Sequence, residues 1–295
     1  MVGVDLQGKT ALITGGTKGI GLASALALAR AGAQTLLTYK WGSAASSAQG
    51  SAAGGAPGSA AGSAQGSAGF DDVAELFTRA GALRPGFFQA DASQEEDTER
   101  LMTELAGSTG KIDIFISNVS FALRTQTLED YKKRSLFKTL EYSTWPLVDY
   151  TRRIKARFGS YPRYVLGISS DGPDHYYRGY DFVAASKALL EFFSRYLAAH
   201  LFEEGSRVNV LRFGTVNTES FRAIFGERFF SYMRENGVPE ESLLTPEACG
   251  SAVLAMCSGL LDAINGQIIS VDYGLPFKDN SMMRYLSQEG ERSVQ

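Results

Sequence analysis

A glycine-rich turn near the start of this 295-residue chain most narrowly limits how it can fold. An apolar strand is expected over residues 9–14, and a helix rich in small residues over residues 20–32. Glycine between two such elements permits a tight turn, lets the backbone approach a phosphate closely, and lets the helix lie near the sheet. We expect the pyrophosphate of a dinucleotide to bind along this turn, at Gly15, Thr17, Lys18, Gly19, Ile20 and Gly21.

Strand and helix patterns alternate along the rest of the chain. Further strands are expected at 35–38, 86–89, 112–116, 163–168, 207–211 and 267–271. Further helices are expected at 71–80, 94–105 (with Ser93 as N-cap), 140–158, 180–200 and 246–258. Because Pro146 lies inside residues 140–158, that helix should kink there or begin near Thr144. The alternation predicts one α/β domain of the doubly wound, Rossmann type, with a parallel sheet and helices on both faces.

A low-complexity stretch interrupts this alternation between the second strand and its following helix. Residues 42–69 consist almost entirely of Gly, Ser, Ala and Gln, so they cannot bury apolar area. We therefore expect a flexible insertion inside one domain that spans residues 1–274, followed by a tail of residues 275–295. The insertion either has no specific role or tethers a partner near the adenosine end of the site.

The overall composition excludes several classes of protein. A net charge of -3 and a pI of about 5.6 argue against nucleic-acid binding. No apolar run reaches the roughly 18 residues of a membrane span, and no secretory signal is evident, so a cytoplasmic protein is expected. Cys249 and Cys257, with only two histidines in the chain, suit neither a disulfide nor a metal site, and we expect both to be core residues.

The end of the second strand indicates which nicotinamide cofactor is used. An NAD site needs a carboxylate there to accept a hydrogen bond from the ribose 2′-hydroxyl. The sequence instead reads Thr38-Tyr39-Lys40. Lys18 and Lys40 either face a 2′-phosphate or form a solvated surface, and we expect NADPH as the cofactor.

Further motifs resemble the short-chain dehydrogenase/reductase superfamily from about residue 7 to 274, outside the insertion. They are Asp91 after the third strand, Ser117-Asn118-Val119-Ser120 after the fourth, and the run from Gly266 to Asp272. The resemblance implies a homo-oligomer, a dimer or tetramer that pairs through the helices at 140–158 and 180–200. It also implies cofactor contacts to adenine, the riboses, the pyrophosphate and nicotinamide at Asp91, Ala92, Asn118, Lys187, Gly214, Thr215, Val216 and Thr218.

The superfamily's usual active-site pair, a tyrosine four positions before a lysine, is incomplete here. Lys187 is present, but position 183 is a valine, which has no transferable proton. Tyr180 lies seven positions before Lys187, and this Tyr-x6-Lys pattern resembles the NADPH-using, FabL-like branch of enoyl-acyl-carrier-protein reductases. The resemblance implies that Lys187 holds the nicotinamide ribose, Tyr180 donates to the substrate carbonyl, and Ser169 or Ser170 assists.

The displaced tyrosine has a physical interpretation. Positions 180 and 183 of one helix share a face about 4.5 Å apart along the axis. Carbonyl reduction adds hydride to the carbon that bears the held oxygen, whereas enoyl reduction adds it to the more distant β-carbon. A tyrosine moved by one turn suits the second reaction. The alternative is that Tyr180 is a packing aromatic at a helix start.

Residues 215–244 form a mobile-looking stretch rich in aromatic side chains. At helical spacing such side chains are usually core, but in this superfamily the region binds substrate, and an apolar acyl chain or ring system would suit it. Candidate substrate contacts are Phe121, Tyr176, Tyr177, Phe221 and Phe225.

Three functions therefore remain open. The first is NADPH-dependent reduction of an enoyl thioester in fatty-acid or polyketide-type metabolism, with acyl carrier protein as a candidate carrier. The second is a ketoreductase acting on a carbonyl of a polyketide or other secondary metabolite. The third is a nucleotide-binding protein without catalysis, which Val183 favours and the retained Tyr180 and Lys187 oppose.

Overall fold

The structure is a computed structural model that describes residues 3–40, 70–121, 123, 125, 127–235 and 240–278. The insertion at 42–69 and most of the tail lie outside the described residues. The described part of the chain forms one seven-stranded, all-parallel sheet in the order β3-β2-β1-β4-β5-β6-β7. Its strands are β1 (Thr10–Ile13), β2 (Gln34–Tyr39), β3 (Gly86–Gln89), β4 (Ile114–Ser117), β5 (Tyr164–Ser170), β6 (Arg207–Phe213) and β7 (Ile268–Val271).

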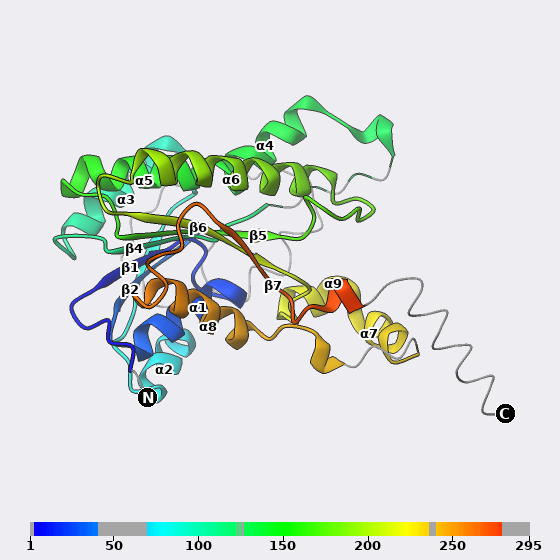
Figure 1. Cartoon of the computed structure of the whole chain (residues 1–295), viewed down its shortest axis with the longest axis horizontal. Helices are drawn as coiled ribbons and strands as arrows, with labels where there is room; N and C mark the ends of the chain where they lie inside the picture. Colours follow the sequence, from blue (N-terminus) through cyan, green and yellow to red (C-terminus); the bar gives the residue numbers. More distant parts are fainter. Residues whose placement is uncertain are drawn as a thin grey trace.

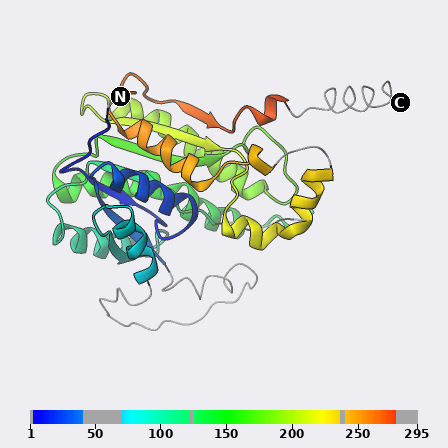
Figure 2. The same cartoon turned by 90° about the horizontal axis from the view of Figure 1, so that it is seen from below.

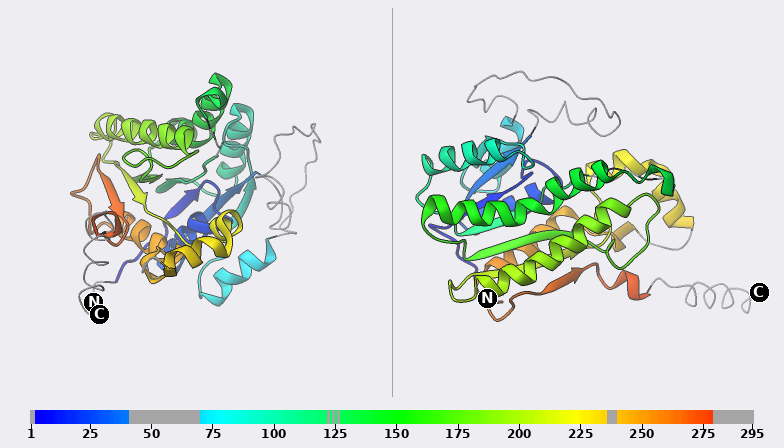
Figure 3. Two further views of the ribbon diagram at one scale, coloured as in Figure 1. Left: turned by 90° about the vertical axis from the view of Figure 1, so that its right-hand side faces the viewer. Right: turned by 90° about the horizontal axis from the view of Figure 1, so that it is seen from above.

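Helices cover both faces of this sheet, as the sequence predicts (Figure 1). One layer contains α1 (Gly19–Arg30), α2 (Asp71–Arg79) and α8 (Pro246–Cys257), with α1 packed along α8 (Figure 2). The opposite layer contains α3 (Glu95–Ala106), α4 (Lys133–Ser143), α5 (Trp145–Phe158) and α6 (Asp181–His200) (Figure 3). The doubly wound α/β class is thereby confirmed.

Alternate residues of each strand pack against the helices on opposite faces of the sheet, because successive side chains of a strand point to opposite faces. Ile13 of β1 packs in the core beneath α1 and α8, whereas Leu12 packs in the core beneath α3, α5 and α6. Cys249 and Cys257 are buried in the first of these cores as free thiols. Since both faces are covered, the central strands β1 and β4 are buried along their whole length.

The strand order reverses between β1 and β4. In open α/β sheets, ligands bind outside the carboxyl ends of the strands at such a point. The turn after β1 and the segment after β4 meet there, since the Thr14 amide donates to the Ile116 carbonyl at 3.1 Å. Of the other elements, η2 (Leu128–Asp130) lies between β4 and α4, whereas α7 (Glu219–Glu235), η3 (Glu240–Ser242) and α9 (Leu275–Lys278) follow β6 and β7 at the same edge (Figure 1).

Two local details can be compared with the sequence analysis. The helical stretch around Pro146 is divided at Thr144, with Pro146 in the first turn of α5, where a missing amide costs nothing. The prediction of a new helix start near Thr144 is confirmed. The prediction that Ser93 caps α3 was wrong: Gln94 is the N-cap, and the Ser93 hydroxyl donates instead to Asp91 at 2.8 Å.

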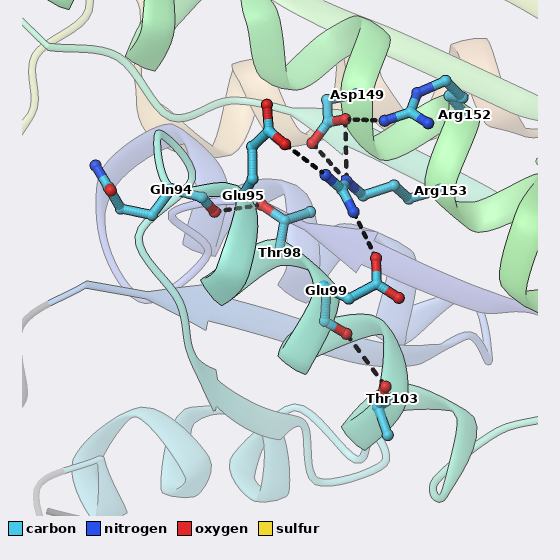
Figure 4. Close-up of polar contacts among 8 residues, drawn as sticks. All are labelled: Gln94, Glu95, Thr98, Glu99, Thr103, Asp149, Arg152 and Arg153. Carbon is cyan, nitrogen blue, oxygen red and sulfur yellow. Dashed lines mark hydrogen bonds and ion pairs between the residues drawn. The ribbon is translucent and has the colours of Figure 1, made fainter. Parts of the chain in front are cut away.

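A charge cluster joins α3 to α5 (Figure 4). Asp149 is almost fully buried, and Arg153 one turn later donates to both of its carboxylate oxygens, at 3.0 and 2.9 Å. The same guanidinium lies 3.6 Å from Glu95 and also pairs with Glu99 of α3. The cluster provides hydrogen bonds and a countercharge to the buried Asp149 carboxylate, and it links α5 to α3.

The stretch over residues 215–244, expected to look mobile, contains the seventeen-residue helix α7. Phe230, Met233 and Leu243 form a small buried cluster against which Phe221 and Phe229 pack. Within the described residues, no helix is long and apolar enough to cross a membrane.

Candidate active site

The glycine turn after β1 is held in place by the neighbouring strands. Gly15 and Gly16 donate their amides to the Thr38 hydroxyl and carbonyl of β2, at 3.3 and 3.2 Å. From the other side, the Asn118 amide donates to the carbonyls of Thr14 and Gly15, at 2.9 and 3.2 Å. Asn118, expected near the adenosine ribose, therefore positions the turn itself.

The geometry of this turn fits a pyrophosphate. Gly19 has a positive φ of 55°, and a Cβ at Gly21 would lie 2.4 Å from the Gly15 carbonyl oxygen, so no side chain fits there. Lys18 is the N-cap of α1 and makes no side-chain cap, which leaves the first-turn amides of α1 available to an anion. Thr218 faces Gly19 from beyond β6, since a Cβ at Gly19 would lie 3.8 Å from the Thr218 methyl carbon.

At the expected adenosine end, three side chains from different elements meet. The Lys40 ammonium lies 2.7 Å from the Asp91 carboxylate and also hydrogen-bonds the Tyr142 hydroxyl, which donates to Asp91 at 2.9 Å. Burial lowers the pKa of Lys40, but its contacts with Asp91 and Tyr142 outweigh burial and raise the pKa overall. Burial likewise raises the pKa of Asp91, but hydrogen bonds from Lys40 and Ser93 lower it overall. Ala92 beside them is buried. The two expected cofactor residues, Lys40 and Asp91, thus contact each other.

Tyr180 and Ser170 come together at the carboxyl end of β5. Tyr180 is the N-cap of α6, one residue before the helix begins, and its hydroxyl donates to the Ser170 hydroxyl at 3.2 Å. The ring packs on Gly172, where a Cβ would lie 2.7 Å from a ring carbon. Burial raises the pKa of the Tyr180 phenol, so the phenol stays protonated. Val183 is buried in the core.

Lys187 of α6 is buried. Its ammonium donates to the Ile168 carbonyl of β5 at 2.8 Å. Burial lowers the pKa of Lys187 to about 8, and the charge of Glu191 one turn later opposes part of that shift. The end of β5 therefore carries a protonated phenol at Ser170 and, two residues earlier on the strand, a buried lysine at the Ile168 carbonyl.

Ser169 belongs to a different cluster from Ser170, because neighbouring strand residues point to opposite faces. Its hydroxyl donates to Glu191 at 2.7 Å. Arg212 of β6 donates to both oxygens of Glu191, at 3.0 and 2.6 Å, and pairs with Asp174. The cluster joins β5, β6, α6 and the segment after β5, and it turns Ser169 away from Tyr180.

A cavity of about 290 Å³ lies at the carboxyl ends of β5, β6 and β7. Side chains of α7 and the segment before α8 form an apolar side. The segments after β5 and β7 supply polar groups. The lining residues are Asp171, His175, Tyr177, Gly214, Thr215, Phe229, Tyr232, Met233, Ser242, Leu243, Leu244, Asp272, Leu275 and Pro276.

The expected substrate residues are distributed unevenly around this cavity. Tyr177 lines it, whereas Tyr176 is 84% exposed. Phe221 packs on Phe229 behind the lining, with ring centroids 5.0 Å apart. Phe121 stacks near Tyr142 at the other end of the site. Phe225 lies in α7, but its side chain is outside the described residues.

Residues expected at the nicotinamide also lie here. Gly214 and Thr215 line the cavity directly after β6, and Val216 is buried and bridges to Leu244. The start of the expected tail, Leu275 and Pro276, lines the cavity as well, so the site extends past residue 274.

Comparison with known proteins identifies the family to which this fold and site belong. The profile of the family described as "Enoyl-(Acyl carrier protein) reductase" matches residues 44–276. The chain belongs to this family of short-chain dehydrogenases/reductases. It is an oxidoreductase of a superfamily that uses nicotinamide cofactors.

Individual relatives of this reductase family differ in activity. The NADH-dependent enoyl-[acyl-carrier-protein] reductase FabI of Aquifex aeolicus is 26% identical over 193 residues, 63% of this chain and 70% of its own. The hydroxynaphthalene reductase of Aspergillus fumigatus is 28% identical over 282 residues, 90% of this chain and 92% of its own. A 7α-hydroxysteroid dehydrogenase structure superimposes with a TM-score of 0.73 at 21% identity, covering 92% of this chain and 96% of that one, and shows the shared fold.

Several residues of this reductase site escaped the sequence analysis. Glu191 lies four positions after Lys187, a helical spacing that could have drawn attention to it. Tyr142, Arg212 and Asp171 gave no such signal, because each reaches the site only through the tertiary fold. They contact Lys40, Glu191 and Tyr177, respectively.

Proposed function

We propose that this chain reduces the carbon–carbon double bond of an enoyl thioester with NADPH. The observation that carries the proposal is the hydrogen bond between Tyr180 and Ser170, at 3.2 Å, with Val183 buried where the superfamily usually has its tyrosine. The phenol is thus held one turn away from the usual position. A displaced hydroxyl suits enoyl reduction, because the hydride is added to the β-carbon while the hydroxyl binds the oxygen of the thioester carbonyl.

The chain's own residues can supply the required electrostatics. Tyr180 and Ser170 can both turn their hydroxyl protons toward one substrate oxygen and stabilise it as negative charge develops. The Lys187 ammonium is buried at the Ile168 carbonyl, two residues before Ser170 on β5, from where it can hold the nicotinamide ribose. The dinucleotide, when bound, supplies the hydride.

NADPH is part of this proposal. No carboxylate ends β2, and Lys18 is an exposed N-cap beside the expected phosphates. Lys40 is bound to Asp91, so it must leave that carboxylate, at least in part, to meet a 2′-phosphate. The thioester carrier, acyl carrier protein or coenzyme A, is proposed only as a class.

The decisive experiment follows cofactor oxidation with a crotonyl thioester and an acetoacetyl thioester, each with NADPH and with NADH. We expect turnover of the crotonyl thioester with NADPH. In Tyr180→Phe, kcat should fall by at least about 100-fold, because the proton donor to the developing charge is lost.

The matched control is Tyr161→Phe, which removes a phenol before β5, outside the cavity lining and the Tyr180–Ser170 pair. It should leave the rate unchanged. Turnover of the ketone alone would overturn the enoyl assignment, and binding of NADPH without turnover of either thioester would favour a non-catalytic nucleotide-binding protein.

A ketoreductase is the second candidate function. Two hydroxyls that converge on one oxygen also suit carbonyl reduction, and Tyr180 and Ser170 are such a pair. The similarity to the hydroxynaphthalene reductase, which extends over 90% of this chain, supports the same reaction. The acetoacetyl thioester arm of the assay tests it directly.

A further inference from the structure

The cavity beyond the Tyr180–Ser170 pair has two chemically different sides. Phe229, Met233, Leu243 and Leu244 make one side apolar. The other side carries two carboxylates, Asp171 after β5 and Asp272 after β7. Such a division suits a ligand with an apolar body and a polar group at one end.

The charges around the polar side are unbalanced. The described lining includes both carboxylates but neither lysine nor arginine. Arg212, the basic residue of the cluster that contains Ser169, is already shared between Glu191 and Asp174. A carboxylate or phosphate brought into this cavity would therefore meet like charge, and among the described lining side chains only His175 can carry a positive charge.

Asp171 is placed to contact a ligand. Its Oδ2 accepts from the Tyr177 hydroxyl at 2.6 Å, whereas no described residue donates to its Oδ1. Asp272, by comparison, accepts from the Gly274 amide at 2.7 Å. A ligand hydroxyl or amino group can complete the hydrogen bonds of Asp171 without displacing a protein donor.

The polar side also adjoins the reacting groups. Asp171 directly follows Ser170 in the chain, and the rings of Tyr177 and Tyr180 lie edge to face with centroids 6.1 Å apart. A group bound to Asp171 would thus be near the carbonyl held by Tyr180, and the apolar body would extend toward α7.

We propose that Asp171 sets the substrate class of this site, selecting neutral or cationic compounds with a hydroxyl or amino donor close to the reacting carbonyl and an apolar chain or ring beyond it. The inference rests on the proposed function, because it takes Tyr180 and Ser170 as the groups that hold the carbonyl. It adds that free acids are rejected at this end of the molecule.

The test uses four ketones that share the group PhCH=CH–CO– and end in –CH3, –CH2OH, –CH2NH3+ or –CO2−. Binding to the full-length protein is measured by calorimetry at pH 7.5 with NADP+ present, alongside reduction with NADPH. We expect the hydroxyl and ammonium compounds to bind about tenfold more tightly than the carboxylate.

Asp171→Asn should reduce this preference to about threefold or less, since one of the two carboxylates is lost. Glu241→Gln removes the same charge from an exposed residue beside the lining residue Ser242 but outside the lining itself, and the preference should remain. Should Asp171→Asn fail to fold, the ranking of the four ketones on the wild-type protein still tests the charge argument.

Equal or tighter binding of the carboxylate compound, or an unchanged preference in Asp171→Asn, would overturn the inference. Failure of the proposed function gives a different result: the ranking in calorimetry persists, but the crotonyl thioester is not reduced. Because binding and turnover are measured separately, the two failures are distinguishable.

Discussion

At Lys187, burial and charge act in opposite directions on one ammonium group. Removal from water lowers its pKa to about 8, and the nearby carboxylate of Glu191 limits the shift. Its charged fraction therefore falls as pH rises through about 8. Tyr180 does not titrate in this range, because its own pKa is raised by burial.

A pH profile follows from these two shifts. We expect kcat/KM for NADPH, which reports the ionisation of the free protein, to fall as pH rises through about 8. In Glu191→Gln the supporting charge is lost, and the fall should begin about half a pH unit lower. A profile that stays flat to pH 10 would show that the charge of Lys187 is not needed.

Lys40 is the second residue with a testable role, which is to bind the 2′-phosphate of NADPH. Its contact with Asp91 means that a cofactor 2′-phosphate must compete with a carboxylate. We expect Lys18→Ala and Lys40→Ala each to raise KM for NADPH about tenfold and to leave KM for NADH within twofold, since only NADPH carries that phosphate. Steady-state kinetics with both cofactors measures this, and equal effects on the two would contradict the 2′-phosphate assignment.

At the level of helices and strands, Arg153 shows how a charge can support packing between helices. It contacts buried Asp149 with two hydrogen bonds and reaches α3, whereas Arg152 makes one bond to Asp149 from a side chain that is 62% exposed (Figure 4). Arg153→Ala should lower the free energy of unfolding by about 3 kcal/mol, because it leaves a buried carboxylate poorly compensated.

The matched variant, Arg152→Ala, should lower the free energy of unfolding by less than about 1 kcal/mol, because the Arg152 side chain is mostly exposed. Urea unfolding compares the two. Similar losses in both variants would mean that Asp149 is stabilised by other groups.

Sequence patterns predicted these elements where the signal is local. The apolar runs of the strands, the proline at the start of α5 and the glycines after β1 each act through neighbouring residues. The cap at Ser93 was mispredicted because Asp91 holds both the amide and the hydroxyl of Ser93, and α3 begins only at Glu95, after Gln94. Tyr180, Ser170 and Lys187 could be grouped from the sequence, because Ser170 ends a strand and the other two lie at the start of the next helix. The contact of Arg212 with Glu191 could not, because it forms only when β6 pairs with β5 in the sheet.

On the scale of the whole molecule, the outer face of α6 exposes aromatic side chains. Phe192 and Tyr196 are about half exposed, with ring centroids 4.6 Å apart, and Phe202, just after the helix, is 62% exposed. We propose that a second copy of the chain covers this face. Light scattering after size exclusion should show a dimer or tetramer for the wild type.

Phe192→Glu should shift that species toward the monomer, since it places a charge in the covered apolar face. Phe137→Glu, a change at another exposed aromatic residue on α4, serves as the comparison. A monomeric wild type, or an oligomer unaffected by Phe192→Glu, would count against pairing through α6.

The cofactor turn and the cavity occupy different halves of one sheet. Gly15, Lys18 and Lys40 follow β1 and β2, whereas every residue that lines the cavity belongs to segments after β5, β6 or β7. Residues 171–177 and 240–244 can therefore be exchanged between relatives without replacing Thr218, which faces the glycine turn, or the residues expected at the nicotinamide. For protein engineering, the two preferences are separable: transplanting residues 171–177 and 240–244 should transfer a choice of substrate while the choice between NADPH and NADH stays with the recipient.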